Sequence, residues 1–520
     1  MPTDAPMLAP RADACQSPDP QADRSPRAVH PPEASSPADL LQDIEALRGA
    51  VDAEGRATLA QWRPAIRRRA FLPAALNLAH YLAFRRRDLR DLQEALIGYG
   101  LSSLGRAESR VLPNLDAVRA SLARIAGAPA PPPWPPARAT GRGLRLLQRN
   151  TAAVLGPADG PRRVRIMVTV GADAAEPDGP IPALVAAGAD VVRLNCAKGD
   201  PAQWAAIVDQ VRRAEAATGR SCRVAMDLCG PRARTGAVAT PADRDRLVEG
   251  DRLLLAREPG PARPDIPFRA VCSLQEALDR LAPGQRVTLD EGAVIARTVS
   301  TDDEGALLVV ERAAGGGVKL AANKGLNFPD TALDPAPLTP KDLADLDAVA
   351  AMADIVGYSF VQRPTDLALL RRELAARRPG ADALPVIAKI ETALAVRNLP
   401  ALIVEGAGHG PFAVMIARGD LAVELGWQRL AEIQEELLWL CEAASVPVVW
   451  ATQVLNRFVR KGTPARAEIT DAAMAERAEC VMLNRGAFQV EAVAVLNDVL
   501  ARMSAHQAKK TSRLRALKSW

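Results

Sequence analysis

One lysine and two acidic side chains in the C-terminal half of the sequence have the types and spacing of a site that handles metal and phosphate. Lys389 and Glu391 lie two residues apart in the apolar run PVIAKIE (385–391), and Asp420 follows the run FAVMIAR (412–418). Residues two apart on a strand point to the same side. Mg²⁺ and Mn²⁺ usually take one or two carboxylates together with water and substrate oxygens. A lysine beside such an ion favours an anionic, phosphorylated substrate.

Other apolar runs also end in polar side chains. Arg193 and Asn195 end one run, Asp227 ends the next, and Arg234 follows it. Further polar residues stand at the ends of the remaining runs, namely Thr169, Ser359, Thr452, Asn484 and Arg485. A lone Ser, Thr or Asp at a strand end is more often a helix cap than a catalyst. A lysine inside an apolar run lacks such a simple structural explanation, because buried lysines are rare unless paired.

The elements that must position these side chains alternate between short apolar runs and amphipathic segments. Eight runs after residue 163 have strand character: VRIMVTV (164–170), DVVRLNC (190–196), CRVAMDL (222–228), DIVGYSF (354–360), PVIAKIE (385–391), FAVMIAR (412–418), PVVWATQ (447–453) and ECVMLNR (479–485). An open doubly wound sheet would also alternate in this way. The count of eight, and the lack of a phosphate-binding glycine fingerprint after the first run, favour an α/β (β/α)₈ TIM barrel.

The remaining segments predict a domain order around this barrel. Between the third and fourth runs, residues 237–321 contain β-rich patches and many turn residues, which predict an inserted small β-barrel that covers the barrel mouth. Helical periodicity begins at Leu40, and APAPPPWPPA (128–137) reads as a stiff linker. The predicted order is a disordered tail (1–37), an N-terminal helical module (38–127), a linker (128–160), the first barrel part (161–236), the inserted lid (237–321), the second barrel part (322–505) and a basic tail (506–520).

The composition is that of a globular protein and excludes several classes. The 520 residues are 48% hydrophobic and 24% charged, and the formal net charge of +5 is too small to argue for nucleic-acid binding. Seven scattered cysteines and four histidines form no metal-ligand spacing and predict no disulfide framework. No signal peptide or membrane-spanning stretch is apparent, so we expect a cytoplasmic protein that binds neither membranes nor nucleic acid. We also expect a homo-oligomer.

Six segments resemble, in order, the signature segments of pyruvate kinases: RLNCAKG, MDLCGPRARTG, NKGLNFP, IAKIE, MIARGDLAVELG and ATQVL. One such motif would be weak, but six in sequence are specific. The resemblance covers about two thirds of the chain, residues 163 to 500. It implies phosphoryl transfer from phosphoenolpyruvate to ADP, with residues 237–321 as the lid. It also implies a divergent member without the C-terminal regulatory domain of the family.

The resemblance assigns roles position by position. Glu391 and Asp420 resemble the ligands of Mg²⁺ or Mn²⁺, Lys389 is similar to the lysine that neutralises the phosphoryl group in transfer, and Thr452 resembles the threonine of the enolate-protonation step. The residues implied in substrate and phosphate binding are Arg193, Asn195, Arg234, Lys324, Ala417, Gly419 and Thr452. Asn195 and Asp227 are what remains of the family's K⁺ pocket.

The sequence departs from the family pattern at that K⁺ pocket. Ala197 and Leu228 replace residues with oxygen ligands, and Arg232 stands where the family has a glutamate. We therefore expect that K⁺ is not required, and that the guanidinium of Arg232, five residues beyond Asp227, takes its place. The segment LNRGAFQVEAV also differs from the family's nucleotide-holding segment.

Two other functions fit parts of the pattern. A metal-dependent lyase or aldolase acting on a pyruvate enolate would need the arginine and the two carboxylates, but neither Lys389 nor a lid. A non-catalytic relative would bind a metabolite and act through its helical module. The lid and Lys389 favour the kinase over the lyase, and the retention of Lys389, Glu391, Asp420, Thr452 and Arg193 argues against a non-catalytic relative.

Overall fold

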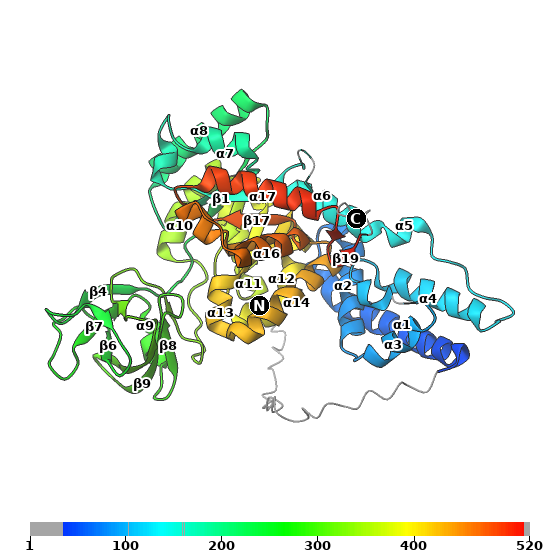
Figure 1. Ribbon diagram of the computed structural model, residues 1–520, viewed down its shortest axis with the longest axis horizontal. Helices are drawn as coiled ribbons and strands as arrows, with labels where there is room; N and C mark the ends of the chain where they lie inside the picture. The colour runs from blue at the N-terminus through cyan, green and yellow to red at the C-terminus, as the bar shows by residue number, and fades with distance from the viewer. Residues whose placement is uncertain (1–34, 102, 159, 161, 514–520) are drawn as a thin grey trace, which may run out of the picture.

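The structure is a computed structural model that describes residues 35–101, 103–158, 160 and 162–513. Most of the tail predicted for residues 1–37, and the last residues of the basic tail predicted for 506–520, lie outside the described residues. Figure 1 shows three parts: N-terminal helices in blue and cyan, a central barrel surrounded by helices, and a green β-rich body projecting from the barrel.

Eight parallel strands close into the central barrel, so the predicted (β/α)₈ architecture is confirmed. Seven strands fall within the predicted apolar runs, and the eighth, β16, extends one residue beyond its run, to Val454. The strands are β1 (Arg165–Thr169), β2 (Val191–Asn195), β3 (Arg223–Asp227), β13 (Ile355–Tyr358), β14 (Val386–Ile390), β15 (Phe412–Ala417), β16 (Val448–Val454) and β17 (Cys480–Leu483). Their order around the barrel is β1-β17-β16-β15-β14-β13-β3-β2. The continuous apolar composition of these runs reflects burial on both faces.

Helices between the strands form the outer layer (Figure 1). The main helices are α7 (Ile181–Ala187), α8 (Pro201–Thr218), α10 (Pro340–Met352), α11 (Pro364–Arg377), α12 (Ala393–His409), α13 (Arg418–Leu425), α14 (Trp427–Ala443), α15 (Asn456–Lys461), α16 (Arg466–Met474) and α17 (Gln489–Met503). Local chemistry sets their starts. Thr339 and Asp342 form a reciprocal capping box at α10, with Pro340 in its first turn.

Helix α6 (Arg142–Leu155) closes the bottom of the barrel, where the strands begin. Val154 and Leu155 at its C-terminal end belong to the same buried apolar cluster as Met167, Ile355 and Met482 of the barrel interior. Arg165 and Arg223 donate side-chain hydrogen bonds to carbonyl groups at this helix end. The segment predicted as a linker, residues 128–160, therefore contains a helix that completes the barrel core.

The lid is a seven-stranded sheet with its own apolar core, and its first and last strands, β4 and β12, extend beyond the predicted bounds 237–321. Its strands are β4 (Thr235–Ala239), β6 (Arg252–Ala256), β7 (Phe268–Cys272), β8 (Arg286–Leu289), β9 (Val294–Asp302), β10 (Gly305–Ala313) and β12 (Leu326–Asn327), with helix α9 (Gln275–Arg280) between β7 and β8. The end strands β12 and β4 approach each other: Thr235 N donates to Lys324 O, and Leu326 N donates to Ala233 O. The sheet thus curls into a small barrel.

The N-terminal helices α1 (Pro37–Trp62), α2 (Leu72–Arg85), α3 (Arg90–Ile97) and α4 (Val111–Ile125) pack against one another and against the barrel. Asn77 on α2 donates to Glu108 O and to Ala443 O at the end of α14. At the C-terminal end, β18 (Gln507–Ala508) and β19 (Thr511–Ser512) form a hairpin whose Lys509 pairs with Glu479. Within the described part of the chain, no helix is long and apolar enough to cross a membrane.

Candidate active site

The candidate active site lies at the carboxyl ends of six consecutive barrel strands. Lys389 is in β14 and Glu391 follows it, while Asp420 lies in the first turn of α13 directly after β15. Arg193 comes from β2, and Asp227 ends β3. Parallel strands end at the same edge of a barrel, so these charged groups converge although they are as much as 227 residues apart in the sequence.

Lys389 stands at the centre of this group. Its Nζ atom donates to Ser359 Oγ at 2.7 Å and lies 3.1 Å from Glu391 Oε1 and 3.6 Å from Asp227 Oδ2. The side chain is buried, with 9% of the residue exposed. Two carboxylates and a hydroxyl therefore stabilise a charged lysine that burial alone would disfavour. Ser359 has a clear structural role here, because its Oγ also donates to Leu228 O.

Asp227 is held by two cations. Arg193 contacts Asp227 Oδ2 through Nε at 2.7 Å and through Nη2 at 2.6 Å, and it also donates to Thr169 Oγ1. Burial raises the pKa of Asp227, but the charges of Arg193 and Lys389 outweigh it and leave the pKa below its usual value. Gly357 on the neighbouring strand β13 makes room for this carboxylate, since a Cβ there would lie 1.8 Å from Asp227 Oδ1.

Glu391 and Asp420 form a pair of buried carboxylates, 3% and 8% exposed. Glu391 Oε2 accepts a 2.6 Å hydrogen bond from Phe360 N. Burial raises the pKa of each group, and the charge of Asp420 raises that of Glu391 further. Asp420 Oδ1 is buried and accepts no hydrogen bond within the described part of the chain, although Arg232 approaches it. Two buried carboxylates with an unsatisfied oxygen fit a divalent cation that takes its remaining ligands from water and substrate.

Arg232 does not take the position expected from the sequence. Its Nη2 atom lies 2.8 Å from Asp420 Oδ1, whereas the cations beside Asp227 are Arg193 and Lys389. The turn after β3 carries Arg232 toward the end of β15. Its fixed positive charge therefore lies beside the carboxylate pair. No group of three or more His, Cys, Asp or Glu side chains with metal-site geometry occurs among the described residues.

Thr452 lies in a strained turn next to the start of α13. Thr452 and Gln453 have positive φ angles of 66° and 60°, which cost energy for non-glycine residues. Arg418 holds this turn: it donates to Ala451 O at 3.0 Å and to Thr452 O at 2.6 Å. Thr452 Oγ1 in turn accepts from Gly419 N at 3.0 Å. Ala417 is the residue before α13, so its backbone lies at the same corner.

The structure does not bring every candidate residue to this cluster. Lys324 pairs with Asp290 of the lid at 2.7 Å, whereas Arg234 donates to Asn323 O at the base of the lid and its charge still acts to lower the pKa of Asp420. Asn195 Oδ1 accepts from Ala197 N, which turns this side chain toward its own loop. The lid touches the barrel mouth where Gln453 donates to Glu291, at 3.4 Å.

Two features of the site were missed from the sequence. Arg418 is fixed by two hydrogen bonds to Asp471, which lies 53 residues further along the chain. Glu424, one turn after Asp420, is partly buried; burial raises its pKa to about 7, although a hydrogen bond from Asn327 opposes the shift. The i, i+4 spacing of Asp420 and Glu424 on one helix face was the available signal for Glu424. No local pattern links Arg418 to Asp471.

Comparison with known proteins agrees with this geometry. A family model for the barrel domain of pyruvate kinase matches residues 161–493. A pyruvate kinase of Agrobacterium vitis is 34% identical over 355 residues, which cover 66% of this chain and 69% of the relative. Pyruvate kinase 2 of Synechocystis sp. is 32% identical over 350 residues (66% and 57%), and a pyruvate kinase of Mycobacterium intracellulare is 35% identical over 326 residues (62% and 65%). The chain belongs to the pyruvate kinase family.

Proposed function

We propose that this protein transfers the phosphoryl group of phosphoenolpyruvate to ADP, with Mg²⁺ or Mn²⁺ as the divalent cofactor. The observation that carries the proposal is the position of Lys389, whose ammonium lies 3.1 Å from Glu391 at the end of a closed parallel barrel. Phosphoryl transfer needs positioning and positive charge more than covalent chemistry from the protein. At this edge of the barrel, Lys389 supplies positive charge, and the carboxylates around it hold it in position.

Glu391 and Asp420 would hold the divalent ion, which when bound withdraws charge from substrate oxygens. Lys389 and Arg193 would face the transferring phosphoryl group from the other side of the cluster. Asp227 orients both cations in advance, because its Oδ2 atom lies 2.6 Å from Arg193 Nη2 and 3.6 Å from Lys389 Nζ. Such preorganised groups lose little energy to reorientation while charge develops on the phosphoryl oxygens.

The corner formed by Gly419 and Thr452 would bind the carboxylate of phosphoenolpyruvate. This corner lies at the first turn of α13, where backbone N–H groups and the helix dipole favour an anion. Thr452 Oγ1 already accepts a hydrogen bond from Gly419 N, so its own hydroxyl proton is free to donate. After phosphoryl transfer, that proton would go to the methylene carbon of the enolate while a solvent water returns a proton to the Thr452 oxygen, which yields pyruvate and restores the hydroxyl.

The test is an assay of purified protein with phosphoenolpyruvate, ADP and Mg²⁺ in which pyruvate and ATP are measured separately. Equal amounts of both products, dependent on the metal, are the expected result. Pyruvate without ATP would contradict kinase activity. The absence of both products with each common nucleoside diphosphate would contradict the proposed reaction altogether.

A further inference from the structure

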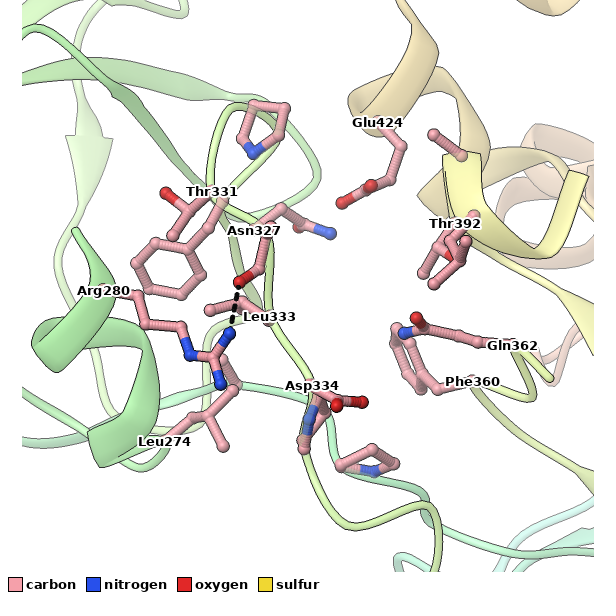
Figure 2. Close-up of a pocket in the computed structure, with 18 of the residues that line it drawn as sticks. Leu274, Arg280, Asn327, Thr331, Leu333, Asp334, Phe360, Gln362, Thr392 and Glu424 are labelled. Carbon is pink, nitrogen blue, oxygen red and sulfur yellow. Dashed lines mark hydrogen bonds between the residues drawn. The ribbon is translucent and has the colours of Figure 1, made fainter. Parts of the chain in front are cut away.

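A cavity lies beside the candidate active site, where the lid joins the barrel (Figure 2). We call it the hinge pocket. It has a volume of about 470 Å³ and is bounded by α9 of the lid, by the chain from residue 326 to 335, and by the barrel loops after β13 and β14. Lys389, Asp420 and Thr452 do not line it, whereas Arg232 and Glu424 do.

One wall of the hinge pocket presents two hydrogen-bond acceptors. Asn327 is only 6% exposed, and its Oδ1 atom has no hydrogen-bond partner among the residues that the structure describes. A buried amide oxygen without a donor costs free energy, which a donor on a ligand would recover. Glu424 faces Asn327 in Figure 2 and accepts a side-chain hydrogen bond from it. An acceptor pair with one negative charge therefore points into this space.

The cations around the pocket are mostly engaged already. Arg232 pairs with Asp420, Arg363 with Asp334, and Arg280 with Glu276 while it also donates to Ala332 O. Arg397 on α12 is different: it is exposed and has no hydrogen bond or ion pair with another described residue. Among the described residues that line the pocket, Arg397 is therefore the one uncommitted positive charge, and it lies at the rim.

The remaining lining is largely apolar. Leu274 and Leu333 come from the lid side, and Phe360 and Leu394 from the barrel side. Concave sites of this kind bind small molecules through an apolar body and a few polar groups that fix orientation. The polar groups here are an acceptor pair at one wall and an arginine at the rim.

We infer that the hinge pocket binds a small primary ammonium compound with an apolar body, an amine or an amino acid. The ammonium donates to Asn327 Oδ1 and to the Glu424 carboxylate, and the apolar body packs against Phe360 and Leu394. A carboxylate, where the ligand has one, reaches Arg397. Because lid and barrel both line the pocket, an occupant would bridge the two parts beside the candidate active site.

Three related probes separate the chemical groups. Leucine carries both charged groups, isoamylamine lacks the carboxylate, and 4-methylpentanoate lacks the amine. Binding to the full-length protein is measured by isothermal titration calorimetry at pH 8, above the Glu424 pKa of about 7. We expect saturable binding of leucine and isoamylamine, and binding of 4-methylpentanoate at least about tenfold weaker, as the loss of one charge-assisted hydrogen bond predicts. Equal binding of 4-methylpentanoate, or no binding of either amine, would overturn the inference.

Variants then assign the groups on the protein. Glu424→Gln should weaken both amines by about tenfold, whereas Arg397→Gln should weaken leucine but leave isoamylamine unchanged. If Arg397→Gln leaves leucine unchanged as well, the ligand is an amine rather than an amino acid. The matched control is Glu432→Gln, which removes an exposed glutamate of α14 outside the pocket. Unchanged binding of the amines to Glu424→Gln would overturn the inference. If Glu424→Gln does not fold, Arg397→Gln serves as a second variant that tests the pocket independently.

Discussion

The two ends of the barrel are built from the same eight strands but have opposite chemistry. At the carboxyl end, Lys389, Glu391 and Asp420 are buried charges close to one another. At the amino end, Val154 and Leu155 of α6 fill the barrel interior with apolar groups. Buried charged groups and a buried oxygen without a hydrogen bond lower the stability of the fold, whereas buried apolar packing raises it.

This difference means that the two ends should respond to mutation in opposite ways. In barrels of this type, residues at the carboxyl ends of the strands carry the chemistry, and those at the other end contribute stability. Substitutions at the mouth should therefore change turnover or metal binding with little loss of folding free energy. Substitutions at the α6 plug should unfold the protein more easily and leave the turnover of folded molecules unchanged.

The largest effect is expected for Lys389→Met. Charge spreads over the phosphoryl oxygens only during transfer, so the lysine should act on the transition state more than on substrate binding. We expect kcat to fall by ~10²–10³, as for the loss of other preorganised donors. Steady-state kinetics measures the effect, with the exposed lid residue Lys319→Met as the control. A normal kcat with only a raised KM would mean that Lys389 merely binds substrate.

At the opposite end, Leu155→Ala should destabilise the fold. Leu155 is 1% exposed and packs inside the barrel, so the truncation leaves a cavity worth ~3 kcal/mol of unfolding free energy. Urea denaturation measures the loss, and kcat per folded molecule should stay the same. Leu144→Ala is the matched control, since Leu144 lies on the same helix and is 40% exposed. A large fall in kcat without loss of stability would break the contrast between the two ends.

Glu391→Gln and Asp420→Asn should weaken binding of the divalent ion. An amide oxygen is a poor ligand for Mg²⁺ or Mn²⁺ compared with a carboxylate. We expect each change to reduce Mn²⁺ affinity on the order of 10²-fold, or ~2.7 kcal/mol. Electron paramagnetic resonance of free Mn²⁺ gives the affinity directly. If both variants bind Mn²⁺ as tightly as the unaltered protein, the metal lies elsewhere.

The amino end also contains a buried acid, which predicts a pH effect on stability. Burial raises the pKa of Glu442, near the end of α14, to about 7 from its ordinary value of 4.5. The folded state therefore holds a proton more tightly than the unfolded state, and stability falls as pH rises from 4.5 through 7. Glu442→Gln should reduce this loss by roughly 2–3 kcal/mol between pH 5 and pH 8. Unfolding at both pH values tests it, with Glu436→Gln, a more exposed change on the same helix, as the comparison.

The barrel was predictable from the sequence because its signals are local. Eight apolar runs and their spacing identified all eight strands, and the period of two placed Lys389 and Glu391 on one side of β14. The role of α6 was not predictable. Its apolar positions indicate that one face of the helix is buried, but they do not indicate that this face packs against the barrel interior. Residues 128–160 therefore read as a linker.

Ion pairs that depend on the path of a turn could not be predicted from the sequence either. Arg232 is near Asp227 in the sequence, yet the chain after β3 carries its guanidinium to Asp420. Arg418 and Asp471 are joined only because two helices meet beside β16. Hydrophobic periodicity fixes which elements form, whereas ion pairs between loops depend on backbone geometry that the pattern does not encode.

The smallest expected effect is that of K⁺ on activity. Asp227 already has Arg193 at 2.6 Å and Lys389 at 3.6 Å, and Arg232 places a fixed charge beside Asp420. These cations are covalently attached, so they need no binding equilibrium and stay in place in any salt. We therefore expect kcat to change by less than about tenfold, or 1.4 kcal/mol, when K⁺ is added. The assay replaces a large inert cation with KCl at constant ionic strength. A larger rise would contradict the prediction. Arg232→Lys should preserve this independence, whereas Arg232→Glu should make activity increase with K⁺. If the activity of Arg232→Glu is also independent of K⁺, then Arg193 and Lys389 supply enough positive charge without Arg232. The positive charge needed at the barrel mouth would then come from residues of the strands rather than from the turn after β3.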